Sequence, residues 1–408
     1  MDGLTLVFPA EQQAPQHARE SVRGGAPPDA LSRAGDGGRS FAAPRPRNIA
    51  LATGGTAGHV TPALAVAAAY RAARPDVRVV FLGNATGFEQ HLVAAHGYGL
   101  ETVPAAPLYG ATARGRLRAV SQLAVGVRRA RHVLTRERID LVIGFGGYAS
   151  AGAVLGARSL GLAAALHEAN VGLGLTNRLL GSVVDRVLLG WEGAATRAAG
   201  RRGRVVGTPI RPDIAALAGE TRRPLDAARL HVLVCGGSQG SPFLNRHAPE
   251  LVGVLRGAGV EVAVRHQSGS GGADDVRAAY ARWAVSAQVE AYVDDMAAAY
   301  RWADVAIACG GAATLAELAA AGLPALLVPL AAAADDHQAE NAAAFAAATG
   351  VPWVREAAWD AAAVGQRLLG LLRDRDAWSG LCERTRRQAR LDAAAAVVAQ
   401  CEALLTSR

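Results

Sequence analysis

One stretch in the second half of the chain combines a strand, a glycine turn and the start of a helix, and it restricts the fold more than any other. Residues 305–308 form a short apolar run typical of a buried strand. Gly310 and Gly311 follow, and glycine lets the backbone approach a ligand closely. The sequence then predicts an Ala- and Leu-rich helix that ends at Gly322. Because the first N–H groups of a helix have no partner within the helix and carry partial positive charge, this turn is suited to a phosphate.

Polar residues near this turn favour a sugar nucleotide. Thr314 and Glu317 lie in the first turns of the predicted helix, and a carboxylate can accept hydrogen bonds from two sugar hydroxyls. Gln338 and Asn341 follow a second apolar run at residues 325–328 and offer amides for another sugar. The alternative at this point is a glycine-rich connection between a strand and a helix that binds nothing.

The same order of strand, glycine turn and helix recurs in both halves of the chain. Residues 48–52 and 230–234 are predicted strands, and glycine-rich turns follow them at 53–62 and 235–241. Alternating β/α halves of this kind predict an α/β protein with two doubly wound Rossmann-like domains that face each other across a cleft. A length of 408 residues also exceeds one ordinary core.

Shifts in composition divide the chain into five predicted segments. These segments are a disordered N-terminal extension over 1–46, a first domain over 47–210, a Pro- and Arg-rich linker over 211–229, a second domain over 230–385 and a C-terminal helix over 386–408.

Charge and cysteine content narrow the possible partners. The net charge of +8, carried entirely by arginine on the basic side, favours anionic ligands or surfaces. Nucleic acid is disfavoured, because aromatic residues make up only 5% and no recognition motif occurs. The cysteines are scattered without a CxxC pair, which is typical of buried thiols in a reducing compartment.

Polar side chains in the first half follow predicted strands. His59 lies in the first glycine turn, Tyr148 in the turn at 144–150, and Glu168 just after the apolar run 163–166. Because the carboxyl ends of parallel strands meet at one edge of a sheet, these side chains are expected near the cleft. We predict His59 as the catalytic group, with Glu168 and Tyr148 as reserves; a structural role for the histidine is the alternative.

The segment 114–138 combines apolar residues at helical spacing with arginines. Leu117 and Leu123 belong to the apolar set, and Arg116 and Arg128 to the basic one. A surface helix packed on the sheet is one interpretation. The other is a patch that binds an anionic membrane surface.

Several motifs occur in a fixed order between residues 48 and 400. They are Gly54-Gly55-Thr56-Ala57-Gly58-His59, Gly144-Phe145-Gly146-Gly147-Tyr148, His167-Glu168-Ala169-Asn170, Gly207-Thr208-Pro209-Ile210-Arg211, Gly236-Gly237-Ser238-Gln239-Gly240, Gly311-Ala312-Ala313-Thr314-Leu315-Ala316-Glu317 and Asp336-His337-Gln338-Ala339-Glu340-Asn341. The set resembles the MurG family of bacterial transferases, in glycosyltransferase family 28. The resemblance implies a GT-B fold and an inverting transfer that needs no metal or cofactor. It implies UDP-N-acetylglucosamine as donor and the muramyl 4-hydroxyl of lipid I, an undecaprenyl pyrophosphate lipid, as acceptor. The implied product is lipid II for peptidoglycan, made by a peripheral enzyme on the cytoplasmic face of the cell membrane.

The resemblance also implies roles for single residues. On the donor side, Val293 would hold uracil through its backbone, Glu317 the ribose and Gln338 the N-acetylglucosamine. The groups facing the phosphates would be Ser238, Ala312, Ala313 and Thr314. The other donor-side candidates are Arg211, Gln239, Leu315, Ala316 and Asn341. From the acceptor domain, the residues lining the cleft would be Thr56, Ala57, Gly58, His59 and Asn170.

Departures from the family pattern lie mostly in the acceptor half. Ala57 stands where glycine is usual and Ala169 where glutamine is usual, so a related transferase acting on another lipid or a secondary metabolite is an alternative. A UDP-N-acetylglucosamine 2-epimerase would share the fold and donor pocket. A non-catalytic sensor of nucleotide sugars is another class. A dinucleotide oxidoreductase is disfavoured, because the first loop misses the GxGxxG spacing.

Overall fold

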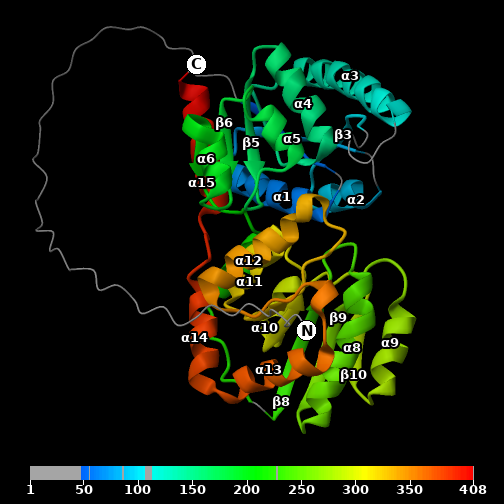
Figure 1. Cartoon of the computed structure of the whole chain (residues 1–408). Coiled ribbons are helices and arrows are strands. Elements are labelled where there is room, and N and C mark those ends of the chain that lie inside the picture. Colours follow the sequence, from blue (N-terminus) through cyan, green and yellow to red (C-terminus); the bar gives the residue numbers. More distant parts are fainter. Residues whose placement is uncertain (1–46, 55, 85–86, 106–112, 227, 408) are drawn as a thin grey trace, which may run out of the picture.

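Two parallel sheets, one in each half of the chain, organise the computed structural model (Figure 1). The structure describes residues 47–407 except 55, 85–86, 106–112 and 227. The predicted disordered extension over 1–46 lies outside the described residues.

The first sheet belongs to the N-terminal lobe. Its strands are β1 (Asn48–Ala52), β2 (Arg78–Gly83), β3 (Leu100–Thr102), β4 (Leu141–Gly144), β5 (Ala163–Glu168), β6 (Arg186–Leu189) and β7 (Gly203–Val205). The helices of this lobe are α1 (Ala57–Ala73), α2 (Gly87–Ala95), α3 (Ala113–Arg136), α4 (Gly147–Ser159), α5 (Leu175–Leu180), α6 (Ala194–Ala199) and the 3-10 turn Gly200–Arg202. The seven parallel strands lie in the order β3-β2-β1-β4-β5-β6-β7, so the chain reverses its winding direction beside β1.

The second sheet belongs to the C-terminal lobe. Its strands are β8 (Arg229–Cys235), β9 (Glu261–Gln267), β10 (Ser286–Glu290), β11 (Val305–Ala308) and β12 (Ala325–Leu327), in the parallel order β10-β9-β8-β11-β12. The helices after the first lobe are α7 (Pro212–Ala215), α8 (Pro242–Gly257), α9 (Ala273–Arg282), α10 (Met296–Trp302), α11 (Ala312–Ala321), α12 (His337–Thr349), α13 (Ala361–Arg373), α14 (Arg375–Arg386) and α15 (Ala393–Thr406). Three further 3-10 turns are Ala216–Gly219, Ala334–Asp336 and Glu356–Ala358.

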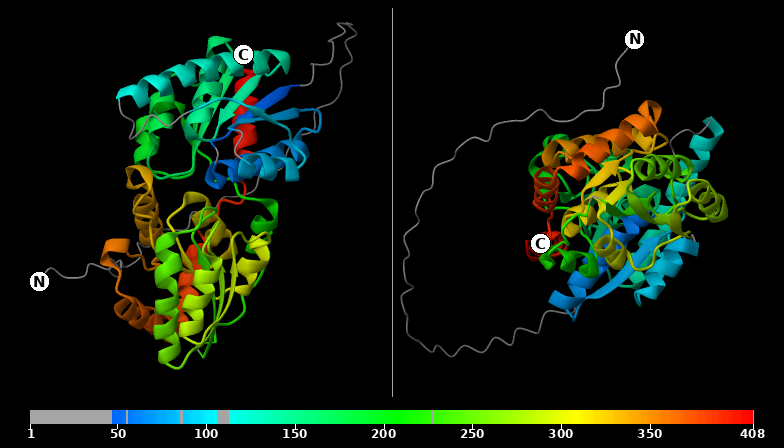
Figure 2. Two further views of the ribbon diagram at one scale, coloured as in Figure 1. Left: turned by 90° about the vertical axis from the view of Figure 1, so that its right-hand side faces the viewer. Right: turned by 90° about the horizontal axis from the view of Figure 1, so that it is seen from below.

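The last helix, α15, returns to the first lobe. Val397 and Cys401 are fully buried in the same apolar cluster as Ile49 and Leu51 of β1. Helix α15 packs beside α1, whereas α14 stays on the second lobe (Figure 1). The side view in Figure 2 shows the same separation, with the end of the chain on the first lobe. The chain therefore crosses between the lobes twice, before α7 and after α14.

The segment predicted as a linker, 211–229, is in large part attached to the second lobe. Ile210, Ile214 and Leu217 are buried and join the core of that lobe. Ile210 lies just before this segment, Ile214 lies in the short helix α7, and Leu217 lies in the 3-10 turn after it. The prolines and arginines of this segment suggested a bare linker, but these three apolar side chains bind it to the second core.

Two glycine turns of the first lobe touch through their backbones. The turns follow β1 and β4, which pair so that Ala52 lies opposite Gly144. A Cβ atom added to Gly54 would lie 2.5 Å from the Cα of Gly147, and one added to Gly147 would lie 2.4 Å from the Cα of Gly54. Gly147 also has a φ of +77°, which favours glycine. These two glycines are therefore required by backbone packing.

We expect Gly54→Ala to lower the stability of the first lobe by about 1–3 kcal/mol, because the added methyl group meets backbone that has little room to move. Gly99→Ala is the matched control in the same lobe, since nothing lies within 4 Å of its added Cβ. Urea unfolding of both variants would measure the difference. Equal midpoints would show that the two turns can separate without cost.

Candidate active site

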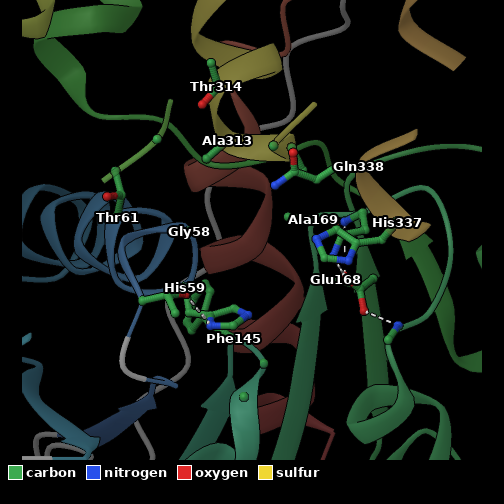
Figure 3. A pocket seen from close by; sticks show the side chains of 18 of the residues that line it. Gly58, His59, Thr61, Phe145, Glu168, Ala169, Ala313, Thr314, His337 and Gln338 are labelled. Atoms are coloured by element: carbon green, nitrogen blue, oxygen red, sulfur yellow. Dashed lines mark hydrogen bonds between the residues drawn. The ribbon is translucent and has the colours of Figure 1, made fainter. Parts of the chain in front are cut away.

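A cavity of about 1060 Å³ lies between the lobes, where the carboxyl ends of both sheets point. Its first-lobe lining includes Thr56, Gly58, His59, Tyr148, Glu168 and Asn170. Its second-lobe lining includes Arg211, Ser238, Gln239, Ala312, Ala313, Thr314, Glu317 and Gln338. The close view in Figure 3 shows His59 and Glu168 below Thr314 and Gln338, across the same space. The structure thus brings most of the predicted site residues together, as expected at the crevice of doubly wound sheets.

The first turn of α11 faces this cavity and supplies the predicted anion site. Gly311 precedes the helix in an extended conformation, and Ala312, Ala313 and Thr314 line the cavity. The unpaired N–H groups and the helix dipole at this end favour a negative charge. Gly310 has a different role, because a Cβ atom there would lie 2.1 Å from the backbone oxygen of Gln338. That glycine allows the turn to pack against α12.

Glu317 lies one helical turn further along α11 and is held by a tyrosine. The hydroxyl of Tyr300 donates to Oε2 of Glu317 at 2.8 Å. Burial raises the pKa of Glu317 to about 7, although Tyr300 and nearby Arg211 act in the opposite direction. The carboxyl group is therefore close to its midpoint of ionisation at neutral pH. Sequence reasoning missed Tyr300; the signal was a tyrosine in an Ala-rich helix, whose buried hydroxyl needs a partner.

His59 lies on the first-lobe side of the cavity with a fixed ring orientation. Its Nδ1 is 3.0 Å from Oγ1 of Thr56. Gly146, with a φ of +97°, lies against the other side of the ring, and a Cβ atom there would be 2.9 Å from Nε2. Burial lowers the pKa of His59 to about 4, and His337 adds a smaller effect in the same direction. The imidazole is therefore neutral at pH 7, which is the form that can accept a proton.

Glu168, a reserve candidate for catalysis, is occupied by its own loop. Oε1 accepts from the backbone N–H of Asn170 at 3.1 Å and from its Nδ2 at 2.8 Å. Oε2 accepts from the N–H of Gly174 and from Nδ2 of Asn177, both at 2.9 Å. These four bonds use the acceptor positions of a carboxylate. The geometry favours Glu168 as the residue that shapes the loop 169–177.

His167, the preceding residue in the same motif, holds a crossing between the lobes. Its Nε2 donates to the carbonyl oxygen of Gly207 at 3.0 Å. Burial lowers the pKa of His167 to about 4, so the ring is neutral and this nitrogen carries the proton. The strand end that supplies Glu168 to the cavity thus also supports the segment that leads into the second lobe.

Some predicted donor-side residues do not line the cavity. Leu315 is fully buried in the second core, and Ala316 packs against that core. Val293 is buried and its N–H donates to Oε1 of Gln267 at 3.0 Å, so this N–H is already bonded within the second lobe. Asn341 is buried behind the cavity, and the side chain of Ala57 lies outside the described residues.

His337 lines the cavity and was not predicted as a site residue. It begins α12, one position before Gln338. The signal was its place in the motif next to a predicted sugar-binding residue. Gln338 itself is anchored, because its Oε1 accepts from the N–H of Leu330 at 3.0 Å. Its amide nitrogen, on the same side-chain group, can donate to a ligand. No group of three or more His, Cys, Asp or Glu side chains suited to a metal ion occurs among the described residues.

Two Rossmann-like lobes with a helix N-terminus facing the cleft are the arrangement of the GT-B fold. The family model for the glycosyltransferase family 28 N-terminal domain matches residues 49–189, and that for its C-terminal domain matches residues 231–397. The chain belongs to glycosyltransferase family 28. The predicted fold and family are therefore confirmed.

Similar proteins cover nearly the whole described chain. A protein of Acidithiobacillus ferrooxidans is 43% identical over 87% of this chain and 97% of its own length. One of Aeromonas hydrophila is 38% identical over 89% of this chain and 98% of its own length. Both are named UDP-N-acetylglucosamine–N-acetylmuramyl-(pentapeptide) pyrophosphoryl-undecaprenol N-acetylglucosamine transferase.

Solved structures give the same fold. The crystal structure of Acinetobacter baumannii MurG has a TM-score of 0.67 and 27% identity, covering 88% of this chain and 99% of that one. A putative UDP-N-acetylglucosamine 2-epimerase from Listeria monocytogenes has a TM-score of 0.64 at 13% identity, covering 88% and 97%. The second similarity concerns the fold alone.

Proposed function

We propose that this chain transfers N-acetylglucosamine from UDP-N-acetylglucosamine to the muramyl 4-hydroxyl of lipid I, with inversion, to form lipid II for peptidoglycan. One observation carries the proposal. The N-terminus of α11 and Glu317 of the second lobe face the neutral His59 of the first lobe across one cavity. The names of relatives that are 38–43% identical support the same donor and acceptor.

The proposed donor position follows from the second lobe. The pyrophosphate would accept hydrogen bonds at the start of α11, where the helix dipole stabilises the charge that grows on UDP as it leaves. Ser238, from the other glycine turn, lines the same cavity. Glu317 would accept from the ribose hydroxyls, and Gln338 would donate to the sugar.

The proposed chemical step is a single displacement. His59 accepts the proton of the acceptor hydroxyl as its oxygen bonds to the anomeric carbon of N-acetylglucosamine. The bond from that carbon to the phosphate oxygen breaks, and UDP leaves with the electron pair. Attack from the face opposite the leaving group inverts the anomeric centre. The pKa of His59, about 4, leaves the imidazole neutral and able to accept this proton at neutral pH, and it also makes the imidazole a weaker base than an ordinary histidine.

The reaction is tested with purified protein, labelled UDP-N-acetylglucosamine and a short-chain lipid I analogue. The expected products are UDP and the disaccharide lipid. Conversion of the donor to a UDP-linked epimer would identify an epimerase instead. Transfer to a soluble secondary metabolite without transfer to lipid I would assign a different acceptor. Donor binding without UDP release, with or without acceptor, would identify a sensor.

His59→Ala is expected to lower kcat by about 10²- to 10⁴-fold, because a positioned base contributes that much to a proton transfer. The affinity for UDP should change little, since the donor groups lie on the other lobe. His96→Ala is the control, because that histidine is exposed. Near-normal turnover of the His59 variant would limit this residue to the structure of its loop.

Affinity for UDP-N-acetylglucosamine is expected to rise with pH between 6 and 8. A carboxyl group with a pKa of about 7 loses its proton over this range, and only the carboxylate accepts from both ribose hydroxyls. The change should be up to about tenfold, the ratio of ionised fractions at the two pH values. Calorimetry on the wild type and on Glu317→Gln measures it. A Gln variant with the same pH dependence would assign the effect to another group.

Helix α3 carries the proposed peripheral contact with the cytoplasmic face of the membrane. Val120 and Val125 are each 56% exposed, and Arg118 and Arg128 are exposed beside them. The predicted contacts Leu117 and Arg116 lie on this helix, but their side chains are outside the described residues. Leu123 is half-buried. Among the helices that the structure describes, none is both long and apolar enough to cross a bilayer.

Binding to anionic vesicles is expected to fall when Val125→Ser and Arg128→Gln are combined, because both the apolar and the basic contributions are reduced. Each arginine near an anionic leaflet adds about 1 kcal/mol, screened by salt. Sedimentation with anionic and neutral vesicles at two salt concentrations measures the loss. Arg282→Gln, an exposed arginine on the second lobe, is the control. Equal binding of all variants would remove α3 from the contact.

A further inference from the structure

One fully buried amide joins the two lobes directly behind the cavity. Asn341 of α12 is 0% exposed. Its Nδ2 donates to Oδ1 of Asn170 and to the carbonyl oxygen of Gly310, both at 3.0 Å. Its Oδ1 accepts from the backbone N–H of Val171 at 2.9 Å. A single side chain of the second lobe therefore bonds to two residues of the first lobe and one of its own.

The hydrogen bonds of Asn341 form a bridge whose two ends, Gly310 and Asn170, belong to the donor side and the acceptor side of the site. Gly310 precedes α11, whose first turn faces the cavity as the proposed phosphate site. Asn170 follows β5 and is held by two hydrogen bonds to Oε1 of Glu168. Glu168 in turn fixes the rest of the loop through Gly174 and Asn177. An unbroken series of hydrogen bonds thus runs from the acceptor-side loop to the donor-side turn.

Helix α12, which carries the proposed sugar-binding residue Gln338, also packs against the residues joined by Asn341. Gln338 lies three residues before Asn341 on α12, and its backbone oxygen is packed against Gly310. Glu340 of the same helix also reaches the first-lobe loop, because a Cβ atom added to Gly172 would lie 2.8 Å from its Oε2. A shift at this contact would therefore move the turn, the helix and the loop relative to one another.

We propose that Asn341 is a positioning residue that sets the distance between the donor turn and the acceptor loop, and that it does not bind substrate itself. The inference rests on the proposed function for its kinetic part only. A transfer reaction requires the acceptor oxygen to lie close to the anomeric carbon and in line with the leaving group, and a displacement of about 1 Å can cost about 10²-fold in rate.

The first test measures the bridge without any acceptor. Hydrogen–deuterium exchange of the segment around Val171 should be faster in Asn341→Leu than in the wild type, because the N–H of Val171 loses its acceptor. Thr349→Val is the matched control on the same helix. Thr349 is also fully buried, but its hydroxyl bonds to Phe345 and Val351 of its own lobe. Equal exchange of this segment in the wild type and Asn341→Leu would overturn the bridge.

The second test measures transfer. Asn341→Leu and Asn170→Ala should each lower kcat by about ten- to a hundredfold, with UDP affinity within about threefold of the wild type. The double variant should be little worse than either one, because both changes break the same bridge. Thr349→Val should keep kcat. Additive losses, or a loss of UDP affinity as large as the loss of kcat, would overturn the positioning role.

The two tests also separate this inference from the proposed function. If lipid I is not the acceptor, kcat is measured with the acceptor found, and the exchange result stands unchanged. If Asn341→Leu does not fold, Asn170→Ala removes the same contact from a half-buried position that lines the cavity. In that variant Nδ2 of Asn341 loses its first-lobe acceptor, and a normal kcat would contradict the inference.

Discussion

The parallel direction of every strand in both sheets determines where chemistry can occur in this chain. Because all strands of a sheet point the same way, their carboxyl ends and the following turns gather at one edge. The two edges face one cavity, so the first-lobe turn with His59 meets the second-lobe turn before α11. Neither lobe alone carries both the anion site and the neutral imidazole. The site therefore depends on how the lobes are held together.

Burial in this cavity has opposite effects on its two main titratable groups. It raises the pKa of Glu317 to about 7 and lowers that of His59 to about 4, because the charged form of either group is disfavoured. As pH rises from 4.5 to 7, the unfolded chain releases the Glu317 proton first, so this group reduces stability. For His59 the direction is opposite. As pH falls from 6.5 to 4, the unfolded chain takes up the His59 proton first, so this group lowers the free energy of unfolding as pH falls. The surrounding packing maintains both groups at a cost in stability, as is usual for functional sites.

Local patterns predicted the parts of this fold but not the contacts between them. Strand β1 has the predicted bounds, Asn48–Ala52, because a short apolar run before a glycine turn is a local signal. Glu317 and Thr314 reach the cavity for the same reason, since their place in the first turns of α11 fixes their direction. Asn341 shares that helix-start pattern on α12, yet it faces the other lobe. Its partners Asn170 and Val171 are about 170 positions away in sequence, and a spacing rule cannot find them. The hydrogen bonds of Glu168 to its own loop could not be predicted either, because a carboxylate after a strand has the same local pattern whether it faces a substrate or its own loop.

The connections between the lobes explain why a single buried amide can matter. The two chain crossings lie side by side, because Gly207 on the outward path packs against Arg390 on the return path. The carbonyl of Gly207 is held by His167, so one crossing is tied to the strand end of β5. Two adjacent connections define a single axis, and one lobe can still rotate about that axis relative to the other. A further contact away from that axis limits the rotation. The hydrogen bonds of Asn341 reach the loop after β5 on the cavity side. The end of β5 therefore contacts the crossing, because His167 bonds to Gly207, and the loop that follows it contacts Asn341 through Asn170. Rotation of the second lobe about its crossings would therefore change the distances from Asn341 to Asn170 and Val171 of the first lobe. Gly310 lies in the same lobe as Asn341, so the turn that begins α11 would move together with that side chain.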